Sequence, residues 1–295
     1  GAVVGALLRD YHQTADDNSP PVAFEFDRAG ALAYRNLPGL SRTSSFHVMD
    51  ETESELRLEA RSPSGVLLRR TLRISGDYVL TVSDEFVNEG DEARKFESPV
   101  MTLGWMEDFA GESSIRGQRT LGIDTYNGAG KVDYWGKKLQ GFFKERQRSG
   151  NLPELPPSVA VDPYGGEQPL DWIAVKNKYF AQILIPDVEG ALRKVRVQAE
   201  RRDATVPGSS YETARVAASA TWETIWLEAG DSTTYSYRFY MGPKKVSQLE
   251  GLGRQAVGVM EFGMLSWLRF PLLKLLNGLH AVVRNYGVAI MLLTL

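Results

Sequence analysis

Cysteine is absent from this chain of 295 residues, and histidine occurs only three times, as His12, His47 and His280. The absence of cysteine excludes disulfides, thiolate zinc sites and cysteine nucleophiles. The histidines do not stand at a metal-ligand spacing such as i, i+4 on a helix, and the sequence has no G-x-S-x-G nucleophile elbow. We therefore expect no metal site, no cofactor and no catalytic residue, and we predict that the protein is not an enzyme.

Acidic residues are missing from the C-terminal end, because no Asp or Glu follows Glu261. That end carries three cations, Arg269, Lys274 and Arg284, so the net charge of -3 divides into +3 there and -6 before it. An overall acidic chain argues against a nucleic-acid partner, whose phosphates require clustered Lys and Arg. The charge therefore separates an acidic main part from a cationic tail.

Long hydrophobic runs are also missing. No uncharged apolar segment approaches the roughly 20 residues that a helix needs to cross a bilayer, which excludes a polytopic membrane protein. Residues 1–11 lack the basic start and the apolar stretch of a signal peptide, so we expect the chain to begin inside a longer protein. A hydrophobic content of 43% is nevertheless ample for a globular core.

Alternation of apolar and polar residues dominates residues 22–240. Tyr235, Tyr237 and Phe239, for example, alternate with Ser236 and Arg238, and the same pattern recurs in many short segments separated by Gly, Asn and Asp. This pattern places one set of side chains on a buried face and the other in water. Many short strands without helical crossovers predict antiparallel sheets packed as a sandwich.

Five prolines interrupt the alternation within residues 151–170. Proline cannot donate a hydrogen bond to a β-ladder, so we expect this stretch to be a surface loop rather than a strand. Because strands of the same character lie on both sides of it, we predict one large β domain over residues 1–241.

The period changes to about 3.6 after residue 241, which predicts helices. We expect a helical linker over residues 242–263 and an amphipathic helix over residues 264–286. Pro271 is expected in the first turn of that helix, where its missing N–H costs nothing, with residues 266–270 as the approach. Residues 287–295 are strongly apolar but rise only about 13 Å as a helix, so we expect them to be the truncated start of a transmembrane helix.

The amphipathic helix has one apolar side and one side that is polar or basic. Tryptophan and cations suit a helix whose apolar face enters lipid while its basic face meets anionic headgroups. The alternative is a helix that only covers the sandwich, and the apolar segment that follows favours the membrane. The membrane-interface residues that we expect are Trp267, Arg269, Leu272, Lys274, Leu275, Leu276, Leu279 and Arg284.

A second candidate surface mixes aromatic residues with five cations and one acid within residues 134–148. Two interpretations are open: a surface for a partner, a ligand or anionic lipid, or an exposed basic hairpin without such a role. Its aromatic members are Tyr134, Trp135, Phe142 and Phe143.

The C-terminal part of the sequence carries a specific series of motifs, and looser ones occur in the β region. The C-terminal motifs are YMGPK at 240–244, FG at 262–263, PLLKLLN at 271–277, LH at 279–280, NYG at 285–287 and AIMLLT at 289–294. The looser ones are GDYVLTV at 76–82, NEG at 88–90, DWIAV at 171–175 and KYFA at 178–181. Through these segments the chain resembles the YidC/Oxa family of membrane protein insertases, in its Gram-negative form with a large periplasmic domain.

The resemblance implies a mainly β fold, namely a large antiparallel β-supersandwich similar to that of galactose mutarotases, followed by C-terminal helices. It assigns residues 1–241 to the periplasmic domain, 242–263 to the linker, 264–286 to an amphipathic helix at the membrane interface and 287–295 to the second transmembrane helix. It also implies a first transmembrane helix before Gly1.

In function, the resemblance implies the periplasmic region of an insertase and chaperone of the bacterial inner membrane. Members of the family assist the insertion and folding of nascent inner-membrane proteins, alone or beside the Sec translocon and its SecD/SecF subunits. Membrane lipid is expected to contact the C-terminal amphipathic helix, and no nucleic acid is expected as a partner.

The alternative function is a mutarotase-like protein that binds or acts on carbohydrate. The enzyme version requires a concave sheet face on which a histidine meets Asp or Glu, and only His12 and His47 lie in the β region. Binding alone would use aromatic rings, for which the candidates are Tyr126, Tyr134, Trp135 and Trp172.

Overall fold

The computed structural model describes residues 2–12, 18–26, 30–37, 39–40, 44–107, 121–130, 132–135, 158–161, 167–202, 213–261 and 266–294. The chain forms two compact units, Gly1–Val259 and Met260–Leu295. The first unit is mostly β-strand, and in the second the described residues form helices. The predicted fold class, mainly β with large antiparallel sheets and C-terminal helices, is confirmed.

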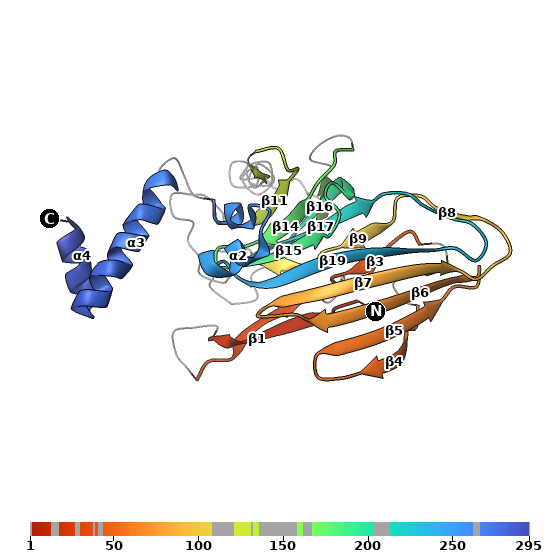
Figure 1. Ribbon diagram of the computed structural model, residues 1–295, viewed down its shortest axis with the longest axis horizontal. Helices are drawn as coiled ribbons and strands as arrows, with labels where there is room; N and C mark the ends of the chain where they lie inside the picture. The colour runs from red at the N-terminus through yellow and green to blue at the C-terminus, as the bar shows by residue number, and fades with distance from the viewer. Residues whose placement is uncertain are drawn as a thin grey trace, which may run out of the picture. The chain divides into compact units, whose positions relative to one another are not determined.

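The first unit contains two large sheets, and Figure 1 shows their long strands, β7 and β19 among them, running side by side. All neighbouring strands of the larger sheet pair antiparallel. Its nine strands, in spatial order, are β12 (Asp133–Tyr134), β11 (Gly122–Tyr126), β14 (Trp172–Lys176), β15 (Phe180–Pro186), β19 (Ser232–Pro243), β7 (Val79–Asn88), β6 (Val66–Ile74), β5 (Glu55–Arg61) and β4 (His47–Glu51).

The smaller sheet has six strands, and two short ribbons complete the unit. The six-stranded sheet contains, in spatial order, β13 (Ser158–Val161), β16 (Leu192–Arg202), β17 (Thr213–Trp222), β9 (Val100–Thr102) and β3 (Ala33–Tyr34), with β10 (Met106–Glu107) also paired to β17. The ribbons pair β1 (Gly5–His12) with β2 (Pro21–Glu25), and β18 (Ile225–Leu227) with β8 (Arg94–Phe96).

The prediction of a loop throughout residues 151–170 is wrong at β13. Residues 158–161 lie between the prolines and pair with β16, for example Val159 with Ala199. β13 is the outermost strand of its sheet, and prolines beside an edge strand remove no hydrogen bond from the ladder. The prolines therefore bound this short strand and do not prevent it.

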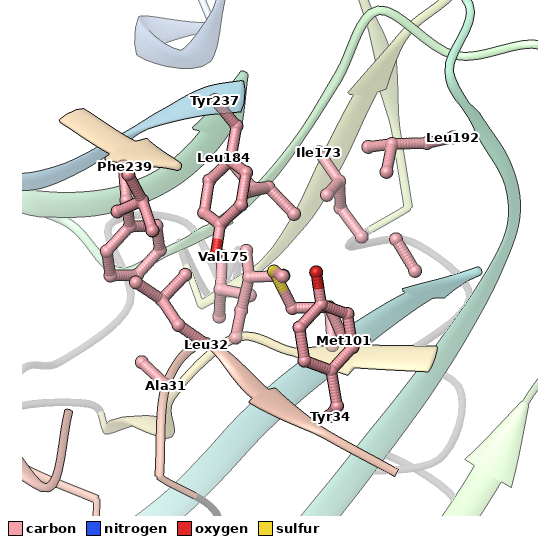
Figure 2. Packing of buried hydrophobic residues seen from close by; sticks show 14 of the residues in the cluster. Ala31, Leu32, Tyr34, Met101, Ile173, Val175, Leu184, Leu192, Tyr237 and Phe239 are labelled. Carbon is pink, nitrogen blue, oxygen red and sulfur yellow. The ribbon is translucent and has the colours of Figure 1, made fainter. Parts of the chain in front are cut away.

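The hydrophobic core lies between the two large sheets. Figure 2 shows Ile173, Leu184 and Phe239 from the nine-stranded sheet close to Tyr34 and Met101 from the smaller one. Their side chains are buried, and the alternation that predicted the strands selects the ones that point inward. Burial of such apolar surface is the main source of stability, at roughly 25 cal/mol per Å².

A fully buried ion pair stands within this core. Arg70 Nε of β6 lies 2.6 Å from Asp84 Oδ1 of β7, and Arg70 Nη1 donates to the carbonyl oxygen of Leu32. The hydroxyls of Tyr34 and Tyr237 both donate to Asp84 Oδ2, at 2.9 and 2.8 Å. Burial raises the pKa of both tyrosines well above the usual value, and Asp84 adds to that effect. This network ties β3, β6, β7 and β19 together through groups that are costly to leave unpaired.

The segment after β19 belongs to the first unit as far as Val259. It forms α2 (Val246–Leu252) and the 3₁₀ helix η2 (Ala256–Met260), whose residues Leu249, Leu252, Ala256 and Val259 are buried. Every residue of β14 and β15 is also buried, so these strands are covered on both faces. The segment predicted as a helical linker, 242–263, therefore lies largely within the compact β unit, which extends to Val259.

A buried lysine holds the end of this segment. Lys176 Nζ lies 2.6 Å from Asp124 Oδ2 and donates to the carbonyl oxygen of Val259 at 2.9 Å, with both charged groups fully buried. The backbone at Gly258 lies close to the side chain of Val132, since a Cβ at position 258 would be only 2.5 Å from that side chain. Trp172 Nε1 also donates to the carbonyl oxygen of Arg254 at 2.8 Å. The chain thus leaves the β unit from a fixed point.

The second unit contains α3 (Ser266–Val283) and α4 (Tyr286–Thr294). α4 turns back and packs beside α3, as Figure 1 shows in blue. Among the described residues, no helix combines the length and the hydrophobicity that a membrane span requires.

The expected position of Pro271 in the first turn of α3 is wrong. The helix begins at Ser266, so Pro271 is its sixth residue. Proline at that position removes the hydrogen bond to the carbonyl oxygen four residues earlier, which costs about 3 kcal/mol in a helix interior. Its fixed φ is nevertheless helical, and only this one N–H is lost, so the helix continues through it.

Candidate membrane-interface site

Seven of the eight predicted interface residues lie in α3, and the eighth, Arg284, follows its last residue. The side chains of Trp267 and Arg269 lie outside the described residues. Leu272 and Leu275 are 39% and 53% exposed, and Lys274 is exposed as well. The described members of the predicted site are thus exposed or half-buried, and none of them is fully buried.

The apolar side of α3 divides into two parts. Leu276, Leu279 and Val283 are half-buried, on the side where α4 packs with its fully buried Ala289. Val282, in contrast, is 83% exposed. The partner helix therefore covers only part of the stripe that the helical periodicity predicted.

α4 adds apolar side chains to the exposed surface. It contains no charged residue, and Met291 is 61% exposed. We call the exposed apolar side chains of the two helices the apolar surface of the C-terminal unit. Its members are Leu272, Leu275, Val282, Ile290, Met291 and Leu292.

The electrostatics of this unit are one-sided. Lys274 and Arg284 are exposed, and the sequence places no acid after Glu261 that could pair with them. Cations next to exposed apolar side chains, without acids, match the composition of helices that bind anionic lipid surfaces.

Two residues connect the helices at a sharp corner. Arg284 adopts a left-handed φ of 54°, which ends α3. Asn285 begins α4, because its Oδ1 accepts hydrogen bonds from the backbone N–H groups of Gly287 at 2.8 Å and Val288 at 3.3 Å. Sequence reasoning missed this cap, although an Asn before an apolar helical run is a known start signal.

The second candidate surface is only partly described, because Phe142 and Phe143 lie outside the described residues. Tyr134 is the last residue of β12, and Lys176 Nζ lies 4.5 Å from the centre of its ring. Trp135 is half-buried and its Nε1 donates to Thr125 Oγ1 at 3.1 Å. Both described aromatic residues thus make contacts inside the β unit.

The residues considered for carbohydrate chemistry are dispersed. His12 Nδ1 lies 2.7 Å from the carbonyl oxygen of Ser19, and His47 is exposed on the edge strand β4. Tyr126 and Trp172 are buried and stacked on each other, with ring centres 5.8 Å apart. Within the described part of the chain, no group of three or more His, Asp or Glu side chains is arranged to hold a metal ion.

Comparison with known proteins identifies the family. The profile of the family described as YidC periplasmic domain matches residues 1–275, which is most of the chain. The chain belongs to the YidC periplasmic domain family. The match extends from the β unit into α3, and it confirms the resemblance that the C-terminal motifs carry.

Curated relatives bear one name, membrane protein insertase YidC. The protein from Geotalea daltonii is 23% identical over 244 residues, which cover 82% of this chain and 39% of that protein. The protein from Syntrophus aciditrophicus is 27% identical over 312 residues, covering 100% of this chain and 51% of that protein. A shorter match, to Magnetococcus marinus, is 41% identical over 71 residues, or 24% of this chain and 13% of that protein. The chain thus spans about half the length of these relatives, or less.

Proposed function

We propose that this chain is the periplasmic, membrane-proximal region of a YidC-type insertase, and that α3 and α4 attach it to the bacterial inner membrane. One observation carries the proposal: the C-terminal unit exposes an apolar surface and contains no acidic residue after Glu261. In water such a surface is costly, at roughly 25 cal/mol for each Å² of apolar area. Lipid acyl chains remove that cost, and anionic headgroups complement Lys274 and Arg284.

The role in insertion follows from family membership and is a proposal for this chain. An insertase lowers the cost of moving polar flanking segments through lipid, which needs neither a cofactor nor covalent chemistry. We propose that nascent inner-membrane proteins are its clients. We further propose that the β unit acts as a partner-binding or spacing module for the Sec translocon and its SecD/SecF subunits, and that the protein also has a chaperone role.

Vesicle flotation tests the membrane attachment. The chain should float with vesicles of phosphatidylethanolamine and phosphatidylglycerol, and Leu275→Glu should weaken this binding roughly tenfold or more, because a buried leucine contributes about 1.5–3 kcal/mol. Trp226→Glu is the matched control, since Trp226 is 59% exposed on the β unit. Equal binding by both variants, or no flotation of the parent chain, would contradict the proposal.

Two further measurements test the finer parts of the proposal. In cells that depend on the complete protein, Leu275→Glu should slow the insertion of a hydrophobic client, whereas Trp226→Glu should not. Photo-cross-linkers placed along the exposed strand β4 of the complete protein should capture a Sec component if the β unit binds the translocon. Insertion at the parent rate by Leu275→Glu would refute the role of the apolar surface.

A further inference from the structure

The corner between α3 and α4 is fixed by side chains on both of its sides. His280, in the last turn of α3, stacks on Tyr286, the first residue of α4. Their ring centres are 3.7 Å apart and their planes differ by 10°. This contact joins the last turn of α3 directly to the first residue of α4.

The backbone of the corner is fixed as well. Arg284 N–H donates to the carbonyl oxygen of His280 at 2.7 Å, so α3 keeps its hydrogen bonding until the chain turns. After the turn, Asn285 provides both its side-chain Oδ1 as the cap and its carbonyl oxygen, which accepts the N–H of Ala289 at 3.0 Å. Only Arg284 separates the last residue of α3 from Asn285, the cap of α4.

Position 287 is part of the same arrangement. A Cβ at Gly287 would lie 3.2 Å from Asn285 Oδ1, which is closer than most real Cβ contacts. A side chain there would require the cap oxygen to shift by a few tenths of an ångström. The Asn-Tyr-Gly sequence at 285–287 thus places the cap, the stacking ring and the small residue in three successive positions.

We propose that His280, Asn285, Tyr286 and Gly287 form a rigid corner whose role is to position α4 against α3. The corner presents Leu275 of α3 and Met291 of α4 to the membrane as parts of one surface. These are positioning residues, because they act through the orientation of the two helices and not through contact with a client. The inference rests on the proposed membrane attachment for its purpose, but the rigidity of the corner can be measured without it.

Pulsed electron–electron resonance measures this rigidity directly. The chain has no cysteine, so Leu275→Cys and Met291→Cys together give two specific nitroxide sites, both on exposed positions. We expect one narrow distance distribution in detergent micelles and in phosphatidylglycerol vesicles. Tyr286→Ala should replace it with a broad one, and Tyr286→Phe, which keeps the ring, should restore the narrow one.

Two further variants separate a loss of stacking from a loss of helix. Tyr286→Leu keeps the helix and the apolar bulk but removes the aromatic face, so it should broaden the distribution as Tyr286→Ala does. Val282→Ala, at a highly exposed position of the same helix end, is the control that should leave the distribution narrow. A narrow distribution for Tyr286→Leu, or a broad one for the parent, would overturn the inference.

Failure of this inference can be distinguished from failure of the proposed function. Flotation reports membrane attachment, and Tyr286→Ala retains the apolar surface, so this variant should still float. If the parent chain floats but shows a broad distribution, the proposed function stands and the rigid corner is refuted. If the parent chain shows a narrow distribution but does not float, the rigid corner stands and the proposed membrane attachment is refuted.

Discussion

The two units of this protein place charged and apolar side chains in opposite ways. The β unit buries whole ion pairs, Arg70 with Asp84 and Lys176 with Asp124, beside its apolar core. The C-terminal unit exposes Lys274 and Arg284 and several of its large apolar side chains. The difference fits the proposed attachment of the helical unit to a membrane, because large exposed apolar side chains that gather on two helices are typical of an interaction surface.

The largest effect is expected from Asp84→Leu in the β unit. It leaves Arg70 buried without its carboxylate, which should lower the free energy of unfolding by about 3–5 kcal/mol, as measured by urea denaturation. Arg69→Met breaks the pairs of a half-exposed arginine with Glu59 and Glu85, and Glu59 keeps Arg61 at 3.4 Å, so it should cost less than about 1 kcal/mol. If Asp84→Leu lowered the free energy of unfolding as little as Arg69→Met does, the buried ion pair would not matter to the stability of the β unit, and the contrast with the C-terminal unit would fail.

A comparable loss, of about 3 kcal/mol, is expected for Lys176→Met, because it removes the cation that lies 2.6 Å from the buried carboxylate of Asp124. The variant also frees the carbonyl oxygen of Val259, so amide hydrogen exchange should accelerate in η2 before the rest of the β unit. Lys95→Met is the control, since Lys95 is exposed and pairs with exposed Glu97. Unchanged protection of η2 would show that Lys176 does not hold the exit of the chain.

The same substitution in the two units should have unequal effects. Leu184→Ala, at a fully buried position of β15, should cost about 2–5 kcal/mol of unfolding free energy. Leu275→Ala, on the apolar surface of α3, should change that free energy by no more than about 0.5 kcal/mol. It should instead weaken vesicle binding, and a large loss of stability for Leu275→Ala would mean that this surface is part of a core.

The smallest effect is expected from alkaline pH. Burial raises the pKa of Tyr34 and Tyr237 well above the usual value, and that of Tyr235 to about 12. The folded β unit therefore keeps protons that the unfolded chain loses above a pH of about 10. The contribution of these protonated hydroxyls to the free energy of unfolding is present below that pH. It is lost as the pH rises through the folded-state pKa values of the tyrosines.

Urea midpoints measured from neutral pH up to a pH of about 12 test this sign. Tyr235→Phe should reduce the alkaline loss, because it removes one of the raised groups. A midpoint that did not fall above pH 10 would contradict the burial of these hydroxyl groups as the cause.

The strands were largely predictable because their pattern is local. Tyr237 and Phe239 of β19 are buried where the alternation placed them. β13 was missed because proline content describes a stretch on average, and the four residues between the prolines can still pair at a sheet edge. The position of Pro271 within α3 was misplaced by the same kind of rule, since one proline does not stop a helix whose other N–H groups are bonded.

The sequence predicted which residues make up the candidate interface, but it did not predict which of their side chains are exposed. The periodicity placed Leu272 and Leu276 on one side of α3, but only packing with α4 decides that the first is exposed and the second half-buried. The stack of His280 on Tyr286 depends on the turn at Arg284, which a helical wheel does not represent. Such contacts are set by the angle between elements.

By itself, the sequence determined the antiparallel β class, the acid-free C-terminal end and the resemblance to the insertase family, because periodicity, charge and motifs are local properties. Only the tertiary structure decided that Lys176 holds the carbonyl oxygen of Val259 and that Asp84 meets Arg70, Tyr34 and Tyr237. Arg70 and Asp84 face each other on adjacent strands, whereas the other partners lie 50 or more residues apart along the chain, and all of them pair only when folding removes them from water. The cost of leaving a buried charge unpaired then makes one arrangement clearly preferred.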